Sequence, residues 1–337
     1  MPTDTVLEPV KLNPVKPRDE KQFVEMEELI AVTSSGYQLS KKISAEELRV
    51  IGQIQLGYQD AFDPRVGRLP GKDPMGTPGQ DGDKADSTPT RPNPPGRFPN
   101  PRPFPRPLDH DDVLESVLGA DSRVQVTPTT SYPWRTIGRV DTGCSGALIG
   151  PRHVLTAAHC IYDTDTDSWL TSLNFAPARD GSSRPFGTIN WSIALTKKGW
   201  TKYHSTNYDW AMIVLDEPIG NTTGWMGYGY NTADSSINLN VSGYPADKPS
   251  GTQWRSYCTS VAFNYSRDKV SHKCDTYPGH SGSPMWKYVA PNYRSIRAIH
   301  TNGASGGFYT TDSESNRATL IDAYLFNTLQ RWKRENP

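Results

Sequence analysis

The sequence predicts an all-β domain that ends in one helix. After residue 116, short stretches rich in Val, Ile, Thr, Tyr and Trp alternate with clusters of Gly, Asn, Asp and Ser, as in ALIGPRHVLTAAH, DWAMIVLDEP, INLNVSGYP and YRSIRAIHTNG. Many short strands joined by turns are typical of a β-barrel or a β-sandwich. Helical spacing in this part occurs only near the C-terminus, where one face would carry Leu320, Ile321, Tyr324, Leu325, Leu329 and Trp332.

The N-terminal third has a different texture. Residues 20–56 contain two short apolar-periodic pieces, FVEMEELI and AEELRVIGQI, that suit short helices. They offer too little apolar material for a core of their own, because domains below about 40 residues usually need help to fold. Residues 62–115 are rich in Pro, Gly, Asp and Arg, which favours an exposed, disordered linker. We therefore expect a prosegment over 1–61, a Pro-rich linker over 62–115 and the β-rich domain over 116–337.

The charge balance argues against several kinds of partner. The chain has 36 Lys and Arg residues and 36 Asp and Glu residues, so its net charge is zero. Nothing therefore favours a nucleic acid or an anionic membrane surface. No apolar run approaches the roughly 20 residues that a membrane-spanning helix needs. We expect a monomer that binds neither nucleic acid nor membrane.

The cysteines indicate the compartment. Cys144, Cys160, Cys258 and Cys274 show no CxxC spacing, so two disulfides are a better interpretation than a zinc site. Disulfides persist in oxidising compartments, and we therefore expect a secreted protein. The first residues carry charge but no apolar h-region, so no secretory signal peptide is visible. We expect no metal and no cofactor.

Three strings could carry chemistry: LTAAHC, NYDWAMIVLD and TYPGHSGSP. They supply His159, Asp209 and Ser281, in that order. A serine hydroxyl is a poor nucleophile unless an imidazole takes its proton and a carboxylate orients that imidazole. GHSGS looks like the nucleophile elbow of α/β-hydrolases, but there an acidic residue and a histidine follow the serine, and no carboxylate lies between Ser281 and His300. The order His, Asp, Ser instead fits the chymotrypsin arrangement.

These motifs resemble those of the chymotrypsin-like serine proteases. The strings SGYPADKPSGTQW, DTYPGHSGSP and IHTNG make the glutamyl endopeptidases the closer match, over roughly residues 116–337. The resemblance implies two antiparallel six-stranded β-barrels, over about 116–216 and 217–318, with His159 and Asp209 in the first. It also implies an endopeptidase that hydrolyses protein or peptide substrates through an acyl-enzyme.

The resemblance assigns further roles. Backbone N–H groups of Gly279 and Ser281 would form the oxyanion hole, where the loss of one donor typically costs about 3 to 4 kcal/mol of barrier. Cys144 and Cys160 match the disulfide that holds the histidine loop in this family. The remaining two cysteines would then pair beside the specificity pocket.

Two interpretations of specificity remain open. Asp275 lies six residues before Ser281, where trypsin-like enzymes place the aspartate that binds Arg or Lys. Thr276 and His300 match instead the residues by which glutamyl endopeptidases bind an acidic side chain. Because a histidine can donate a charge-assisted hydrogen bond to a carboxylate, we predict cleavage after Glu or Asp. Cleavage after Arg or Lys through Asp275 is the alternative.

The residue before the serine bears on activation. His280 stands where trypsin-like zymogens have the aspartate that pairs with the new N-terminal amine, so that salt bridge cannot form. In the glutamyl family the free N-terminus instead helps to bind the acidic side chain. Family members begin near a string like SVLGADSR, so we predict that the mature chain begins at Ser116 after self-cleavage following Glu115.

Other interpretations are a catalytically silent homologue that binds peptides in the cleft, and a Pro-rich linker that serves as a ligand for SH3- or WW-type grooves. His204 and His272 have polar sequence neighbours, and we expect both at the surface.

Overall fold

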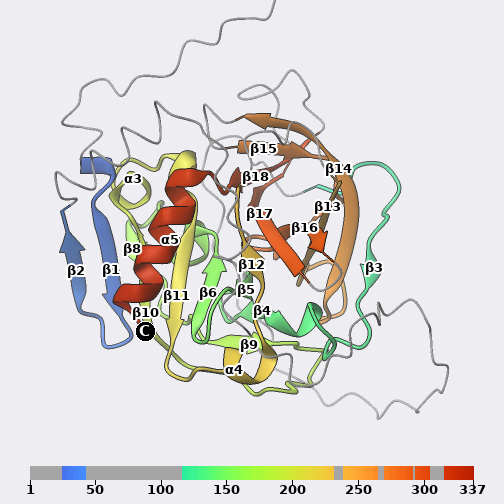
Figure 1. The fold of residues 1–337 in the computed structure, drawn as a ribbon, viewed down its shortest axis with the longest axis horizontal. Helices are drawn as coiled ribbons and strands as arrows, with labels where there is room; N and C mark the ends of the chain where they lie inside the picture. Colours follow the sequence, from blue (N-terminus) through green and yellow to red (C-terminus); the bar gives the residue numbers. More distant parts are fainter. Residues whose placement is uncertain (1–24, 43–115, 231–237, 265–268, 291–292, 304–314) are drawn as a thin grey trace, which may run out of the picture.

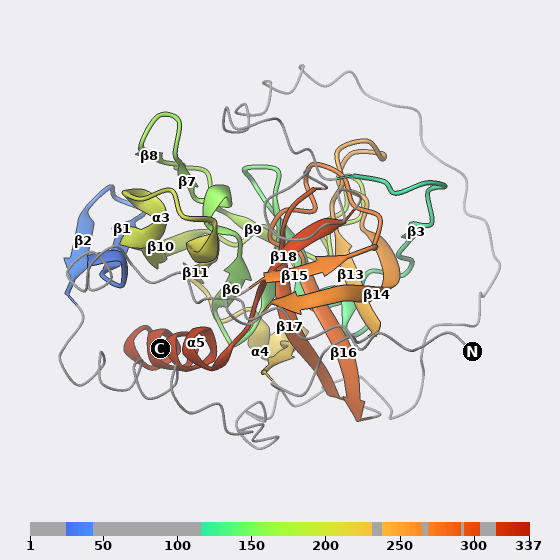
Figure 2. The ribbon, with the colours of Figure 1, turned by 90° about the horizontal axis from the view of Figure 1, so that it is seen from above.

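The computed structural model describes residues 25–42, 116–230, 238–264, 269–290, 293–303 and 315–337. Two antiparallel β-sheets lie side by side within them, and the C-terminal helix α5 packs across one face of the first (Figures 1 and 2). The linker predicted over 62–115 and the predicted helix AEELRVIGQI lie outside the described residues. No helix in the described part of the chain is long and apolar enough to cross a membrane.

The first sheet has the strand order β2-β1-β10-β11-β6-β5-β4-β9. Its strands are β1 (Leu29–Thr33), β2 (Gln38–Lys41), β4 (Ile137–Val140), β5 (Ser145–Leu148), β6 (His153–Thr156), β9 (Phe175–Pro177), β10 (Trp191–Lys197) and β11 (Ala211–Leu215). Phe175, in β9, and Ile189, two residues before β10, exchange two backbone hydrogen bonds of 2.9 and 2.8 Å. This bridge joins the β9 end of the sheet to the segment that leads into β10. The six strands β4, β5, β6, β9, β10 and β11 thus form the first predicted barrel.

The second sheet closes on itself. Its strands are β12 (Gly227–Tyr228), β13 (Asn238–Gly243), β14 (Trp254–Asn264), β15 (Lys269–His272), β16 (Pro284–Ala290), β17 (Tyr293–Asn302) and β18 (Asn316–Leu320), while β3 (Val124–Gln125) pairs with β14. Because β17 pairs with both β16 and β18, the six strands β13, β14, β15, β18, β17 and β16 form a ring. This is the second predicted six-stranded barrel.

Short elements complete the chain. They are η1 (Trp134–Thr136), η2 (Ala158–Cys160), β7 (Tyr162–Asp163), β8 (Ser168–Trp169), α3 (Lys198–Thr201), η3 (Thr206–Tyr208) and α4 (Gly220–Thr223). Of these, η2 and η3 carry the segments of the first barrel that were singled out for chemistry.

The C-terminal helix forms, but it begins later than its apolar pattern. Helix α5 spans Ala323–Glu335, and the Asp322 side chain caps it by accepting the N–H of Leu325 at 2.7 Å. Leu320 ends β18 instead of belonging to the helix. Leu329 and Trp332 of the helix are fully buried against the first barrel.

The helix predicted for FVEMEELI lies partly outside the described residues. Within them Glu25 and Met26 are helical, whereas Leu29 and Ile30 belong to β1, which pairs with β10. An isolated segment of this length has little helical stability of its own, and pairing with an edge strand overrides the local pattern. The N-terminal segment therefore joins the first sheet as a β-hairpin, β1-β2.

Candidate active site

His159 and Asp209 follow from two paired strands of the first barrel. Ala211 of β11 lies opposite Thr156 of β6. His159 comes three residues after Thr156, in η2, and Asp209 comes two residues before Ala211, directly after η3. Because the strands are antiparallel, the end of one and the start of the other bring these two side chains together.

The contact between them is tight. Nδ1 of His159 lies 2.9 Å from Oδ2 and 3.1 Å from Oδ1 of Asp209, and the His159 backbone N–H donates to Oδ1 at 3.0 Å. The Asp209 side chain is 1% exposed and that of His159 is 27% exposed. Burial alone would raise the pKa of Asp209, but His159 and the charge of Lys269 lower it below its usual value. An ionised carboxylate only accepts, so Nδ1 carries the proton and Nε2 is left as the basic nitrogen.

Two residues of the second barrel hold the Asp209 segment, and nothing in the sequence motifs indicates them. The buried ammonium of Lys269, in β15, donates to the carbonyl of Thr206 and, at 3.0 Å, to Oγ1 of Thr319. The Thr319 hydroxyl donates in turn to the backbone carbonyl of Asp209 at 3.2 Å. The second barrel thereby fixes a carboxylate that belongs to the first.

The loop that carries Ser281 is tied to both barrels. The carbonyl of Ser281 accepts the N–H of Ser145, in β5, at 2.8 Å, and the N–H of Gly282 donates to the carbonyl of His300, in β17, at 2.8 Å. The buried hydroxyl of Ser145 donates to the carbonyl of Gly279 at 2.7 Å and accepts the N–H of Tyr244 at 2.9 Å. Ser281 therefore sits on a loop held at both ends.

Two glycines in this loop have conformations that other residues rarely adopt. Gly279 has φ +106° and Gly282 has φ +81°. A Cβ at Gly279 would lie 2.4 Å from the carbonyl oxygen of Tyr244, and one at Gly282 would lie 2.2 Å from that of Ser145. Both the turn and the close backbone approach require glycine at these positions.

His300 lies in a buried group of histidines. It is 0% exposed, and its Nδ1 lies 3.1 Å from Nε2 of His272. The ring of His280 is centred 6.5 Å from that of His300. Burial, followed by the proximity of His300, lowers the pKa values of His272 and His280 well below the usual value. The prediction that His272 lies at the surface is wrong, because every residue of β15 is buried despite its polar sequence; His204 is exposed as predicted.

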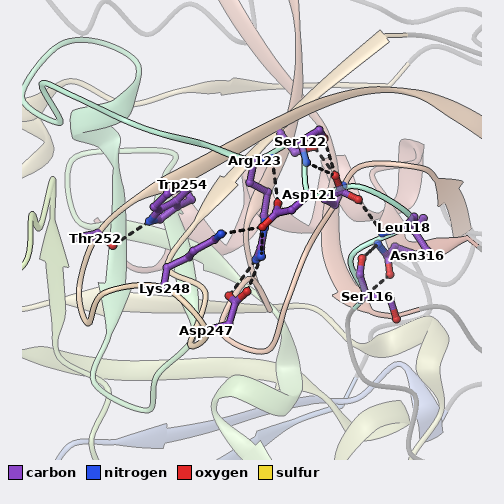
Figure 3. A network of polar contacts seen from close by, with 12 residues as sticks. Ser116, Leu118, Asp121, Ser122, Arg123, Asp247, Lys248, Thr252, Trp254 and Asn316 are labelled. Carbon is purple, nitrogen blue, oxygen red and sulfur yellow. Dashed lines mark hydrogen bonds and ion pairs between the residues drawn. The ribbon is translucent and has the colours of Figure 1, made fainter.

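Ser116 lies beside Asn316, the first residue of β18 (Figure 3). The N–H of Ser116 donates to Oδ1 of Asn316 at 3.0 Å, and its carbonyl accepts the Asn316 amide at 2.7 Å. The same carbonyl accepts the backbone N–H of Thr276 at 3.2 Å. Asn316 lies opposite His272 in the β15–β18 pairing. Ser116 is thus connected to Thr276 directly and to the histidine group through Asn316.

Asp275 binds the N-terminal segment of the domain. Its Oδ1 accepts the N–H of Leu118 at 2.7 Å, and its Oδ2 accepts the N–H and the hydroxyl of Ser122 at 2.8 and 2.5 Å. The residue is 3% exposed. Both carboxylate oxygens are therefore engaged within the chain, which weighs against a role for Asp275 in receiving a substrate Arg or Lys.

A charged group anchors the same segment further along (Figure 3). The Arg123 guanidinium is fully buried and lies 2.8 Å from Oδ2 of Asp121 and 2.5 Å from Oδ2 of Asp247. Lys248 adds a contact of 2.7 Å to Asp121. Residues 116–125 are consequently fixed to the second barrel at Asn316, at Asp275 and at the Asp247 loop.

The four cysteines form the two disulfides that were predicted. Cys144 pairs with Cys160, next to His159, and Cys258 pairs with Cys274, two residues before Thr276. Among the described residues, two groups have metal-ligand proximity, and each consists of one of these disulfides with a neighbouring histidine. A disulfide sulfur is not a thiolate, so neither group offers the ligand set of a zinc site.

The fold and the candidate site define a trypsin-like serine protease. Residues 123–307, more than half of the chain, match the family model described as Trypsin, and the chain belongs to that family. It is a serine endopeptidase that acts on protein or peptide substrates.

Within this class the chain belongs to the glutamyl endopeptidase family. It is 39% identical over 228 residues to a glutamyl endopeptidase of Bacillus licheniformis, which covers 65% of this chain and 70% of that protein. It is 36% identical over 230 residues to a Bacillus subtilis protein named extracellular metalloprotease, covering 64% and 69%. A solved structure of a Glu endopeptidase in complex with MPD matches with a TM-score of 0.57 and 26% identity, over 65% of this chain and 99% of that one.

Proposed function

We propose that this protease cleaves after glutamate or aspartate, with Ser281 as nucleophile, His159 as general base and Asp209 as the group that orients His159. The observation that supports the triad best is the contact of 2.9 Å between Nδ1 of His159 and the buried carboxylate of Asp209. It leaves Nε2 to accept a proton, as the general base of such a triad must.

The proposed reaction has two halves. The Ser281 hydroxyl attacks the scissile carbonyl carbon while its proton passes to His159, and the carbonyl oxygen becomes an oxyanion near the N–H groups of Gly279 and Ser281. The C–N bond then breaks as His159 gives the proton to the leaving amine, which leaves an acyl-enzyme. Water repeats the sequence on the ester, with His159 again taking and returning the proton, and releases the acid product.

For specificity, we propose that His300 and Thr276 bind the acidic side chain. The neighbours of His300 in the pocket are further histidines, of which His272 and His280 have lowered pKa values. A substrate carboxylate would accept a charge-assisted hydrogen bond from an imidazole N–H there. The ammonium of a substrate lysine would find the Asp275 carboxylate already engaged by Leu118 and Ser122.

For activation, we propose cleavage between Glu115, which lies outside the described residues, and Ser116. Ser116 already makes its contacts with Asn316 and Thr276 in the uncut chain. Cleavage would convert its amide N–H into an ammonium group at the same place. Activation would thus add a positive charge close to Thr276 without a large movement of residues 116–122. We also propose that the protein is secreted, in keeping with its two disulfides.

The test combines active-site labelling with a cleavage profile. The purified protein should react with a fluorophosphonate probe, and Ser281→Ala should abolish labelling. A peptide library should give faster cleavage after Glu than after Gln, Lys or Arg. Faster cleavage after Lys or Arg would overturn the specificity, and absence of labelling in the processed wild-type chain would favour the silent, peptide-binding alternative.

A further inference from the structure

The N-terminal hairpin extends the first barrel from outside the protease domain (Figure 1, blue strands). Strand β1 pairs with the β10 edge over five positions, from Leu29 opposite Lys197 to Thr33 opposite Ile193. Ala31 and Val32 are 5% and 4% exposed and belong to the core of the barrel. An edge strand with unpaired backbone groups readily accepts another strand, and here the chain supplies one.

Glu27, at the entrance to β1, is buried among three elements of the protease domain. Its Oε1 accepts the hydroxyl of Tyr208 at 2.5 Å, and its Oε2 accepts the hydroxyl of Tyr324, in α5. Lys197, at the end of β10, lies 3.4 Å from Oε2 and donates to the Glu27 carbonyl at 2.7 Å. Glu27 is 3% exposed and Lys197 is 0% exposed. Burial raises the pKa of Glu27, and the charge of Lys197 opposes that rise, so Lys197 favours the ionised form of Glu27 at this buried position.

The charges around this contact are complementary. Glu28 lies 2.9 Å from Lys198, and Glu25 lies 3.0 Å from Lys198 and 2.6 Å from Lys202. Acidic residues of the N-terminal segment thus face basic residues at the end of β10, in α3 and directly after α3. If the hairpin left, Lys197 would lose its contacts with Glu27 and β10 would become an open edge, both of which oppose dissociation.

The contact is next to the candidate triad. Tyr208, whose hydroxyl binds Glu27, directly precedes Asp209. Helix α3 begins after Lys197 and carries Trp200, whose ring is centred 6.4 Å from that of His159. Glu27 therefore fixes a residue adjacent to the carboxylate that orients His159.

We propose that the hairpin of residues 25–42 stays bound through Glu27 after activation, so that the mature enzyme consists of two non-covalently associated chains. In this complex Glu27 is a positioning residue for the Tyr208–Asp209 segment. The inference rests on the proposed cleavage after Glu115 for its biological setting. Its test uses a different cut, so that the two proposals fail separately.

The binding test uses the full chain with Ser281→Ala and a site for an unrelated protease inserted within residues 75–90. After cutting, the N-terminal fragment is expected to co-elute with the protease domain in size-exclusion chromatography and to be lost in Glu27→Ala. The control is Lys41→Ala, which breaks the exposed pair of 2.9 Å between Lys41 and Glu335 and should retain the fragment. Separation of the unmutated fragment, or equal retention in all variants, would overturn the proposal.

The positioning role is tested in the active chain. Glu27→Gln is expected to lower kcat about 10- to 100-fold with little change in KM, because the general base would be misplaced. The same variant replaces Glu27→Ala in the binding test if Glu27→Ala does not fold. Lys41→Ala should leave kcat unchanged. A kcat for Glu27→Gln equal to that of Lys41→Ala would contradict the role, and a raised KM with normal kcat would place Glu27 in substrate binding instead.

Discussion

His159 and His300 lie in the two barrels of one protease and have opposite surroundings. His159 faces the buried carboxylate of Asp209 at 2.9 Å. His300 faces the imidazole of His272 at 3.1 Å, with His280 close by. In the proposed mechanism, the first arrangement stabilises the imidazolium that forms on His159 in every catalytic cycle. The second places His300 near the imidazoles of His272 and His280, whose pKa values burial lowers, and in the proposed specificity the negative charge that His300 binds comes with the substrate.

The largest effect is expected when the negative charge of Asp209 is removed from the first barrel. Asp209→Asn should lower kcat about 10⁴-fold, because an amide N–H facing Nδ1 would favour the wrong tautomer of His159. The measurement is kcat with a Glu peptide. The matched control is Asp167→Asn, whose exposed carboxylate lies 3.0 Å from His204 and should be dispensable. Similar losses in the two variants would contradict the role of Asp209.

In the second barrel, a substitution of His300 is expected to change the substrate preference of the enzyme and not the rate of bond cleavage as such. His300→Gln should lower kcat/KM for Glu peptides about 10- to 100-fold, which is the range for one hydrogen bond to a charged group. Cleavage after Gln should change much less, because Gln brings no charge into the pocket. The measurement is the ratio of kcat/KM for Glu and Gln peptides, with His204→Gln as the exposed control. An unchanged ratio would remove His300 from the specificity pocket.

A substitution of Asp275 tests whether its carboxylate stabilises the fold of the second barrel or binds a basic substrate side chain. Asp275→Asn should lower the free energy of unfolding by about 2 to 3 kcal/mol, because hydrogen bonds from Leu118 and Ser122 lose a charged acceptor. Urea unfolding of the variant in a Ser281→Ala background measures this, with the exposed Asp216→Asn as control. In the active chain, a loss of cleavage after Lys or Arg caused by Asp275→Asn would instead restore the trypsin-like role of Asp275.

The smallest effect concerns the acid stability of the two barrels. Burial holds the pKa values of His272 and His280 below the usual value of 6.5, so the unfolded chain takes up protons first and the free energy of unfolding falls as the pH drops below about 6.5. Asp209 has a lowered pKa, so its contribution persists above the unfolded value of 3.8 and is lost only below it.

His272→Gln should therefore flatten the decline in urea stability between pH 7 and pH 5, by up to about 1.4 kcal/mol per pH unit. The exposed His204→Gln should not. An unchanged slope in His272→Gln would mean that His272 is not the group that takes up the proton.

The sequence predicts those features that are written locally. TAAHC, NYDWAMIVLD and GHSGSP mark positions where a few adjacent residues must have particular shapes, such as the glycine at φ +81° after Ser281. Short stretches rich in Val, Ile, Thr, Tyr and Trp between turn residues locate strands such as β6, β11 and β17, and the cysteine pairs follow from the family resemblance. The two barrels and both disulfides could be predicted in this way.

The features that the sequence does not reveal depend on residues far apart in the chain. Asp275 stands where trypsin-like enzymes have their specificity aspartate, yet its partners lie more than 150 positions away, at Leu118 and Ser122. The support of Asp209 by Lys269 and Thr319 has no motif. Leu29 and Ile30 were predicted as the end of a helix but belong to β1, because the partner strand β10 lies in another part of the chain. A pattern within a short stretch of sequence carries no information about such long-range contacts.

The contacts of Ser145 limit how independently the sequences of the two barrels can change among homologues. Through its amide and its hydroxyl, this residue of the first barrel holds the carbonyls of Ser281 and Gly279 in the second. The loop that carries Ser281 is therefore held by residues of both barrels. If the barrels moved apart, its hydrogen bonds to Ser145 would break. A chimaera that joins the first barrel of one homologue to the second barrel of another must keep this serine and the matching loop as one inherited unit, even though they lie 134 positions apart.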